Sequence, residues 1–199
     1  MAKKKGQRKG IFCLETHWWG VKGKSTVEPV LRLLETLSGY NAPYRHYDVG
    51  TREEFDFYLK KWCGTTFKDF PILYLSFHGT PGELHVGEGR DKSLSLDDLA
   101  ARLEDGCRGR VLHLGSCGTV DVHGRELKKL LGRTGALAVC GFREEVDWLE
   151  SAAFELLVLG GLQGASFLQT SSLRKFDQEL KGSAPGLYKQ LGFRMTCRD

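Results

Sequence analysis

The chain has 199 residues, 41% of them hydrophobic and 27% charged, and its 29 Lys and Arg against 25 Asp and Glu give a formal charge of +4. Five basic residues lie in the first ten positions, so the rest carries −1 and lacks the basic face of a dedicated nucleic-acid-binding domain. The composition excludes a disordered chain, and no apolar stretch has the length of a membrane span or of a signal peptide.

Short apolar runs alternate along the chain with segments of helical periodicity. In chain order, strands are predicted at 10–15, 44–49, 70–77, 110–114, 135–142 and 193–197. Helices are predicted at 25–39, 51–62, 95–103, 126–131, 147–162 and 166–180, with a Gly-rich excursion at 82–90. This alternation requires crossover connections, and it predicts an α/β fold, a three-layer α/β/α sandwich with a mostly parallel sheet of about six strands.

Several predicted helices begin with a capping pattern. Ser25-Thr-Val-Glu28, Thr51-Arg-Glu-Glu54 and Asp147-Trp-Leu-Glu150 each place a short polar residue three positions before an acidic one. In a capping box these two side chains satisfy each other's free backbone N–H groups. We therefore expect helices to start at these three places.

Residues 1–9 are predicted to form a basic, flexible tail and residues 10–199 a single domain. The tail is interpreted as a solvated end, with contact to nucleic acid or anionic lipid as the alternative. The six cysteines form no CxxC pair, and without a secretion signal they predict reduced thiols and a cytoplasmic protein. Three of them lie in apolar surroundings typical of buried small residues: Cys13, Cys63 and Cys140.

The residues after the two most apolar strands predict the functional site. Strand 70–77 ends in His78-Gly79, and strand 110–114 leads into Cys117. If the strands are parallel neighbours, their carboxyl ends lie about 5 Å apart or one strand further, at the edge where such sheets carry their sites. An imidazole beside a Cys generates the reactive thiolate, and a glycine lets the backbone approach closely, turn sharply and aim an N–H at an oxyanion. Taken alone, a Cys after a strand is more often a buried small residue, and a His-Gly pair is often only a turn.

Spacing argues against other chemistries for Cys117. A Cys-based phosphatase has Arg six residues after the nucleophile, where this chain has His123. Hydrolases with a nucleophile elbow place their His well after the nucleophile, and His123 is the only downstream His and is too near. His113, Cys117 and His123 match no standard zinc spacing, and no phosphate-binding loop is present. We therefore predict neither a metal nor a cofactor.

These motifs carry a resemblance. Leu75-Ser-Phe-His78-Gly79, followed by Leu114-Gly-Ser-Cys117-Gly-Thr119, resembles the caspase-like (clan CD) cysteine peptidases. It is most similar to the CHAT-domain proteases, in which a small residue precedes the Cys and Thr or Ser lies two residues after it. The intervening segment 83–99 and the helix after Val146-Asp-Trp148 are also similar, so the resemblance covers roughly residues 9–162.

The resemblance implies a caspase-like sheet and an endopeptidase that works through a thioacyl-enzyme. Cys117 would be the nucleophile and His78 the acid/base, with the backbone N–H groups of Gly79 and Cys117 as the oxyanion hole. It implies a protein or peptide substrate, a regulatory protein partner and a place in bacterial antiviral defence or cell death. The alternative hypothesis is a non-catalytic caspase-like or flavodoxin-like module that binds a protein partner or a nucleotide.

The preference for the substrate residue P1, whose carbonyl is attacked, stays open. Metacaspases place Asp two residues before the Cys and caspases place Gln-Ala before it, whereas this chain has Gly115-Ser. Asp147 is either an N-cap or a substrate ligand, and Arg143 is a candidate for holding an acidic P1 residue. Trp148 either walls the pocket or packs in the core, and the pair Trp18-Trp19 either lines a substrate groove or covers the core.

Overall fold

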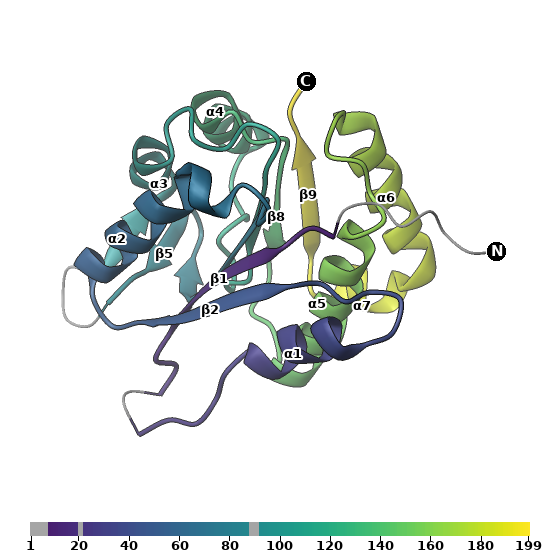
Figure 1. Ribbon diagram of the computed structural model, residues 1–199, viewed down its shortest axis with the longest axis horizontal. Helices are drawn as coiled ribbons and strands as arrows, with labels where there is room; N and C mark the ends of the chain where they lie inside the picture. Colours follow the sequence, from purple (N-terminus) through teal and green to yellow (C-terminus); the bar gives the residue numbers. More distant parts are fainter. Residues whose placement is uncertain (1–7, 20–21, 88–91) are drawn as a thin grey trace.

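The computed structural model describes residues 8–19, 22–87 and 92–199 (Figure 1). Residues 1–7 of the expected tail and 88–90 of the Gly-rich excursion lie outside the described residues. The strands are β1 (Ile11–Thr16), β2 (Tyr44–Val49), β3 (Ile72–Ser76), β4 (His78–Thr80), β5 (Glu83–His85), β6 (Ser93–Ser95), β7 (Val111–Leu114), β8 (Ala138–Phe142) and β9 (Phe193–Cys197). The helices are α1 (Glu28–Thr36), α2 (Arg52–Cys63), α3 (Leu96–Arg102), α4 (Gly124–Thr134), α5 (Trp148–Leu162), α6 (Thr170–Ser183) and α7 (Pro185–Gln190), with a short 3₁₀ helix at Thr65–Phe67.

Six strands form the central sheet in the order β2-β1-β3-β7-β8-β9. The first five run parallel and β9 pairs antiparallel with β8 at one edge. The inner strands β3, β7 and β8 are buried along their whole length, as continuous apolar runs in a parallel sheet require. The predicted α/β fold class, with a mostly parallel sheet of six strands and the edge strand at 193–197, is confirmed.

Helices cover both faces of this sheet and make it the middle of three layers (Figure 1). On one face the buried residues of α2, α3 and α4 pack against Phe12, Leu73 and Leu112. On the other, α1, α5 and α6 pack against Ile72 and Val111 and their neighbours. Because strand residues alternate between faces, Tyr74 and Ser76 of β3 and His113 of β7 belong to the face that α5 covers.

A small antiparallel sheet, β4-β5-β6, follows β3 directly. His78 and Gly79 are therefore strand residues that pair with His85 and Leu84, and the sharp turn expected at Gly79 is wrong. The small sheet lies beside the carboxyl ends of β3 and β7, so it carries His78 to the edge of the sheet where Cys117 follows β7.

Helix starts agree with the sequence at α2, α3 and α5, whereas α4 begins two residues earlier than expected and α1 and α6 begin later. Thr51 forms the predicted capping box with Glu54. At α1 the helix begins only at Glu28, and its N-cap Val27 makes no side-chain cap. The buried carboxyl group of Glu15 accepts a 2.8 Å hydrogen bond from Val27 N instead, so the capping box expected from Ser25 is wrong.

The N-terminal segment is bound to the end of α5 through Lys9. Lys9, the last residue of the expected tail, exchanges two backbone hydrogen bonds of 3.0 Å with the side chain of Gln163. Its ammonium group also donates to Gln163 O and lies 5.1 Å from the ring centroid of Phe167.

Among the described residues, no helix is long and apolar enough to cross a membrane.

Candidate functional site

His78 is held by the segment that follows β1. Its Nε2 lies 3.1 Å from the backbone oxygen of Trp18. The Trp18 ring meets the imidazole edge to face at 4.8 Å, and the Trp19 ring meets it at 6.0 Å. Because a carbonyl oxygen only accepts, the hydrogen bond requires the proton on Nε2 and leaves Nδ1 as the nitrogen available for acid/base work.

Cys117 lies on a loop that is fastened to the small sheet. Thr119 Oγ1 donates to Glu83 O at 3.1 Å, and Gly82 N donates to Thr119 O at 3.2 Å. A Cβ atom at Gly79 would lie 2.2 Å from Thr119 Oγ1 and 2.9 Å from Cys117 O. Close approach to the Cys117 loop, rather than a turn, therefore explains the glycine at 79. The structure brings the His78-Gly79 strand and the Cys117 loop together, as predicted from adjacent strand ends.

Cys117 lines a narrow pocket of about 70 Å³ between β3, β7 and α5. The aromatic walls come from Trp18 and Trp148, whose rings meet edge to face at 5.0 Å. The pocket is lined by Trp18, Thr26, Val27, Val30, Tyr74, Ser76, Gly115, Cys117, Val146, Trp148, Ser151, Ala152 and Glu155. Trp18 thus links the two predicted catalytic residues, since its ring contacts His78 and lines the pocket of Cys117.

A buried polar cluster forms the inner end of this pocket. Tyr74 Oη donates a 2.6 Å hydrogen bond to Glu155 Oε2, and His113 Nε2 lies 3.4 Å from Glu155 Oε1. Burial first, and then the charge of Glu155, raise the pKa of Tyr74 well above its ordinary value. Tyr74 therefore stays protonated at physiological pH and remains a donor to the Glu155 carboxyl group.

The predicted substrate ligands are only partly found at the pocket. Trp148 lines it, whereas Arg143 and Asp147 are not among its lining residues. Asp147 is the N-cap of α5 and accepts hydrogen bonds from the backbone N–H groups of Leu149 and Glu150. Arg143 Nε donates to Gly192 O.

Glu155 and Ser76 are among the lining residues that were not predicted from the sequence. Trp148, Ser151, Ala152 and Glu155 follow the spacing of one helix face, at i, i+3, i+4 and i+7. The available signal was an acidic residue on the core-facing side of the most apolar helix of the chain. Such a residue seldom lies inside a protein without a partner, so its position alone indicates a polar site beneath α5.

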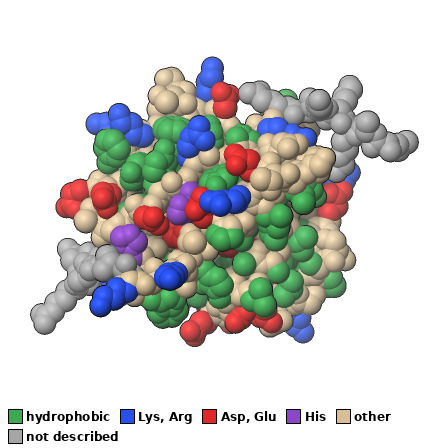
Figure 2. All heavy atoms as spheres, turned by 60° about the horizontal axis from the view of Figure 1, so that its bottom comes forward, with side chains coloured by type: hydrophobic (Ala, Val, Ile, Leu, Met, Phe, Trp, Pro, Cys, Tyr) green, Lys and Arg blue, Asp and Glu red, His purple; other side chains and the backbone are tan. Residues whose placement is uncertain are grey.

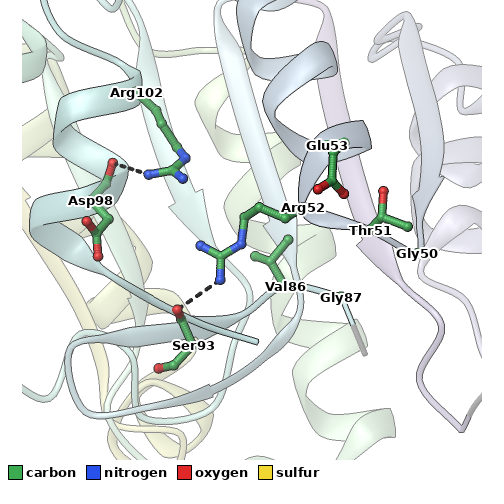
Figure 3. Close-up of a pocket in the computed structure, with 9 residues that line it drawn as sticks. All are labelled: Gly50, Thr51, Arg52, Glu53, Val86, Gly87, Ser93, Asp98 and Arg102. Atoms are coloured by element: carbon green, nitrogen blue, oxygen red, sulfur yellow. Dashed lines mark hydrogen bonds between the residues drawn. The ribbon is translucent and has the colours of Figure 1, made fainter. Parts of the chain in front are cut away.

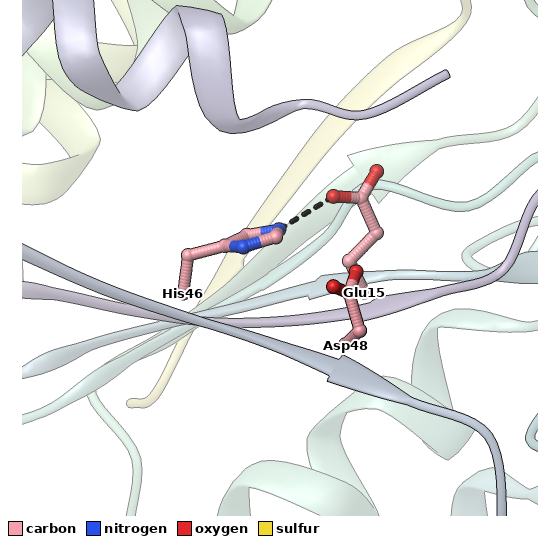
Figure 4. Close-up of side chains that lie close together, drawn as sticks. All are labelled: Glu15, His46 and Asp48. Carbon is pink, nitrogen blue, oxygen red and sulfur yellow. Dashed lines mark hydrogen bonds and ion pairs between the residues drawn. The ribbon is translucent and has the colours of Figure 1, made fainter. Parts of the chain in front are cut away.

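Glu15, His46 and Asp48 come close together on β1 and β2 (Figure 4). They offer ligand atoms within 4.8 Å of one another, which is compatible with a metal ion. The buried Glu15 carboxyl group, however, already accepts hydrogen bonds from Trp18 Nε1, Thr26 Oγ1 and Val27 N and lies 2.6 Å from His46 Nε2. These partners satisfy it, and they identify Glu15 as the residue that organises the Trp18 segment and the start of α1.

The metal spacing considered in the sequence does not converge on one point. His113 lies in the core, with Nδ1 3.4 Å from Cys140 Sγ. His123 caps α4 and accepts from Arg125 N, on the surface of the molecule.

A second, larger hollow of about 730 Å³ lies between the start of α2 and β6 (Figure 3). Arg52 reaches across it and donates to Ser93 O at 2.9 Å. Arg102 donates to Asp56 and to the backbone of Asp98. The hollow mixes the basic Arg52 and Arg102 with the acidic Glu53 and Asp98, so it does not favour one class of ligand.

Hydrophobic side chains are spread over the face that comes forward when the molecule is tilted from the view of Figure 1 (Figure 2). Among exposed large hydrophobic residues, Trp19 is 71% and Leu149 76% exposed, next in sequence to the pocket residues Trp18 and Trp148. An apolar surface of this kind is typical of contact with another polypeptide.

Comparisons with known proteins place the chain as follows. The model of a family described as "Family of unknown function (DUF6642)" matches residues 8–196. No curated protein matches the chain. The chain is similar to the crystal structure of caspase-1 from Spodoptera frugiperda, with 11% sequence identity, a TM-score of 0.46, and 80% of this chain and 70% of that chain covered.

Proposed function

We propose that this chain, which belongs to the family of unknown function DUF6642, is a cysteine endopeptidase that uses Cys117 and His78. The observation that carries the proposal is the fastening of the His78 strand and the Cys117 loop to each other at the carboxyl edge of β3 and β7. A nucleophile and a base on neighbouring strand ends, beside an open pocket, match the requirements of acyl transfer. The motif around Cys117 further favours a relationship to the CHAT-domain proteases.

The proposed reaction has two half-reactions. The Cys117 thiolate attacks the scissile carbonyl carbon while the N–H groups of Gly79 and Cys117 donate to the oxyanion. The C–N bond then breaks, His78 gives a proton to the leaving amine, and a thioester remains on Cys117. Water, deprotonated by His78, attacks this thioester and releases the carboxylic acid product and the thiol. No cofactor takes part in this scheme.

A folded partner protein is the proposed substrate. The exposed Trp19 and Leu149 flank the pocket residues and provide apolar surface for a polypeptide. Cleavage of one specific partner, under control of a regulatory protein in a defence or cell-death system, is proposed from the sequence resemblance.

Selective labelling of the full chain by a peptide electrophile tests the proposal. Alkylation by a small reagent alone is insufficient, because a hydrogen bond from Cys107 lowers the pKa of Cys63 and makes that half-buried thiol a competitor. Mass spectrometry of tryptic peptides should place the peptide label on Cys117. His78→Ala should abolish labelling of Cys117 and leave alkylation of Cys63 by iodoacetamide unchanged.

Two results would contradict the peptidase. One is labelling of Cys117 that is the same in wild type and His78→Ala. The other is peptide labelling of Cys63 or Cys197, the other half-buried cysteines, at the rate of Cys117.

A further inference from the structure

We propose that the pocket beside Cys117 binds the P1 residue and selects a basic side chain, Lys or Arg, through the carboxyl group of Glu155. This inference rests on the proposed peptidase function and names the substrate class of that same site.

The pocket runs from the surface into the core. Trp148 on its wall is 39% exposed, whereas Glu155 is 3% and Ser76 1% exposed. Cys117 is half-buried. A side chain that enters beside the nucleophile therefore reaches Ser76 and Glu155 at its tip.

The carboxyl group lies directly beneath the backbone that precedes the nucleophile. A Cβ atom at Gly115, two residues before Cys117, would lie 2.7 Å from Glu155 Oε1 and 2.5 Å from the Tyr74 ring. Glu155 therefore occupies the space that a side chain at position 115 would need. An acidic group that the sequence lacks before Cys117 is supplied instead from α5.

The floor of the pocket has unused hydrogen-bonding capacity. Glu155 Oε2 accepts from Tyr74, while Oε1 has only the 3.4 Å contact with His113, which lacks hydrogen-bond geometry. Ser76 Oγ is buried and makes no hydrogen bond of standard geometry among the described residues, although its interaction with Tyr74 tends to lower the pKa of that phenol. Buried polar groups are nearly always satisfied, so an oxygen pair left open at the end of a pocket indicates a donor that comes from outside.

Charge favours a cationic donor. No Lys or Arg is among the residues that line the pocket in the described chain. Glu155 is the only acidic or basic residue among the described residues that line the pocket. Its carboxyl group therefore favours a cationic tip and disfavours an acidic P1 residue.

The walls and the volume fit the rest of a basic side chain. Val30, Val146 and Ala152 are apolar and suit an aliphatic stem. A cavity of about 70 Å³ holds roughly five water-sized groups, which corresponds to the four-carbon stem and ammonium group of Lys.

Paired peptide electrophiles that differ only in charge at P1 test the inference. Lys is compared with norleucine, and Arg with citrulline, since each pair has nearly the same shape. The second-order rate of labelling at Cys117 is measured by intact mass on the full chain. We expect the charged member of each pair to react about tenfold faster or more, as a charge-assisted hydrogen bond implies.

Variants then assign the preference to Glu155. Glu155→Gln keeps the shape and should remove the difference within each pair by slowing the reaction of the charged member. Glu150→Gln, on the same helix but bound to Gln190 at the surface, is the matched control and should keep the difference. Ser76→Ala should reduce it in part, and circular dichroism confirms that each variant is folded.

The outcomes separate the inference from the function on which it rests. Equal rates within each pair on wild type, or a faster reaction with Asp at P1, would overturn the basic preference and leave the peptidase intact. A difference that persists in Glu155→Gln would overturn the role of Glu155. Failure of every peptide to label Cys117 would overturn both.

Discussion

The imidazole Nε2 of His78 lies 3.1 Å from the backbone oxygen of Trp18, two residues beyond the end of β1. The bond ties the proposed catalytic base to a segment that is itself held by the buried Glu15 through Trp18 Nε1. The orientation of His78 therefore depends on a strand that is adjacent to β3 but contributes no catalytic group. This makes Trp18 a positioning residue for the proposed reaction.

Trp18→Ala should lower the reactivity of Cys117 about tenfold, because the ring contacts that fix His78 are lost and part of its general-base effect goes with them. Iodoacetamide is the suitable reagent, since it is too small to depend on the pocket walls, and mass spectrometry of tryptic peptides separates its reaction at Cys117 from that at Cys63. Trp19→Ala is the control, as its ring is mostly exposed and 6.0 Å from the imidazole. Equal losses in the two variants would argue against positioning by Trp18.

Gly79→Ala should disrupt the site and destabilise the fold. The new methyl group would lie 2.2 Å from Thr119 Oγ1 and 2.9 Å from Cys117 O, so the Cys117 loop must move. Overpacking of this kind costs about 1–3 kcal/mol of unfolding free energy, measured in urea, and Cys117 should lose its selective labelling. Gly132→Ala in α4 meets no atom within 4 Å and should instead stabilise the chain by roughly 0.5–1 kcal/mol. An unchanged stability of Gly79→Ala would contradict the close packing.

The inner strands β3, β7 and β8 could be predicted from the sequence because they are continuous apolar runs. The strands at 44–49 and 193–197 match β2 and β9 in full. Helix starts could be predicted where the cap is local, as at Thr51. At α1 the cap comes from Glu15 across the fold, and no local pattern could reveal it. Long-range polar contacts override local signals there.

The candidate site could likewise be predicted where the sequence signal is local, and not where it depends on contacts between distant residues. His78 and Cys117 could be found because each directly follows an apolar strand, and chain order alone suggests their proximity. Asp147 was considered as a substrate ligand because it lies past β8, but its carboxyl group is used by the α5 backbone. Glu155 was passed over because its partner Tyr74 is 81 residues away, and only the fold shows that they meet.

Asp147→Ala should cost stability without changing the P1 preference. Loss of an N-cap lowers the unfolding free energy by about 0.5–2 kcal/mol, and Asp147→Ser should restore it because Ser also accepts from the first turn. Urea unfolding and the paired-peptide rates are measured on the same samples. A changed ratio of rates between Lys and norleucine in Asp147→Ser would show that the carboxylate contacts substrate after all.

The pair His46 and Glu15 should make stability depend on pH near neutrality. Burial alone would lower the pKa of His46, but the hydrogen bond with Glu15 and the charges of Glu15 and Asp48 outweigh it, and the pKa is raised. A His whose pKa is higher in the folded state stabilises the fold fully below its unfolded value of about 6.5. This contribution disappears as the pH rises through the folded pKa.

Unfolding free energies measured in urea from about pH 6 to pH 9 should therefore fall through the range above 6.5 in wild type. His46→Gln should flatten this part of the curve because the titrating group is gone. His123→Asn, which keeps an acceptor at the α4 cap, should leave the slope unchanged. Glu15→Gln should flatten the slope and also cost about 3–5 kcal/mol, since its buried donors lose a charged acceptor. The same slope in wild type and His46→Gln would show that this pair does not carry the pH dependence.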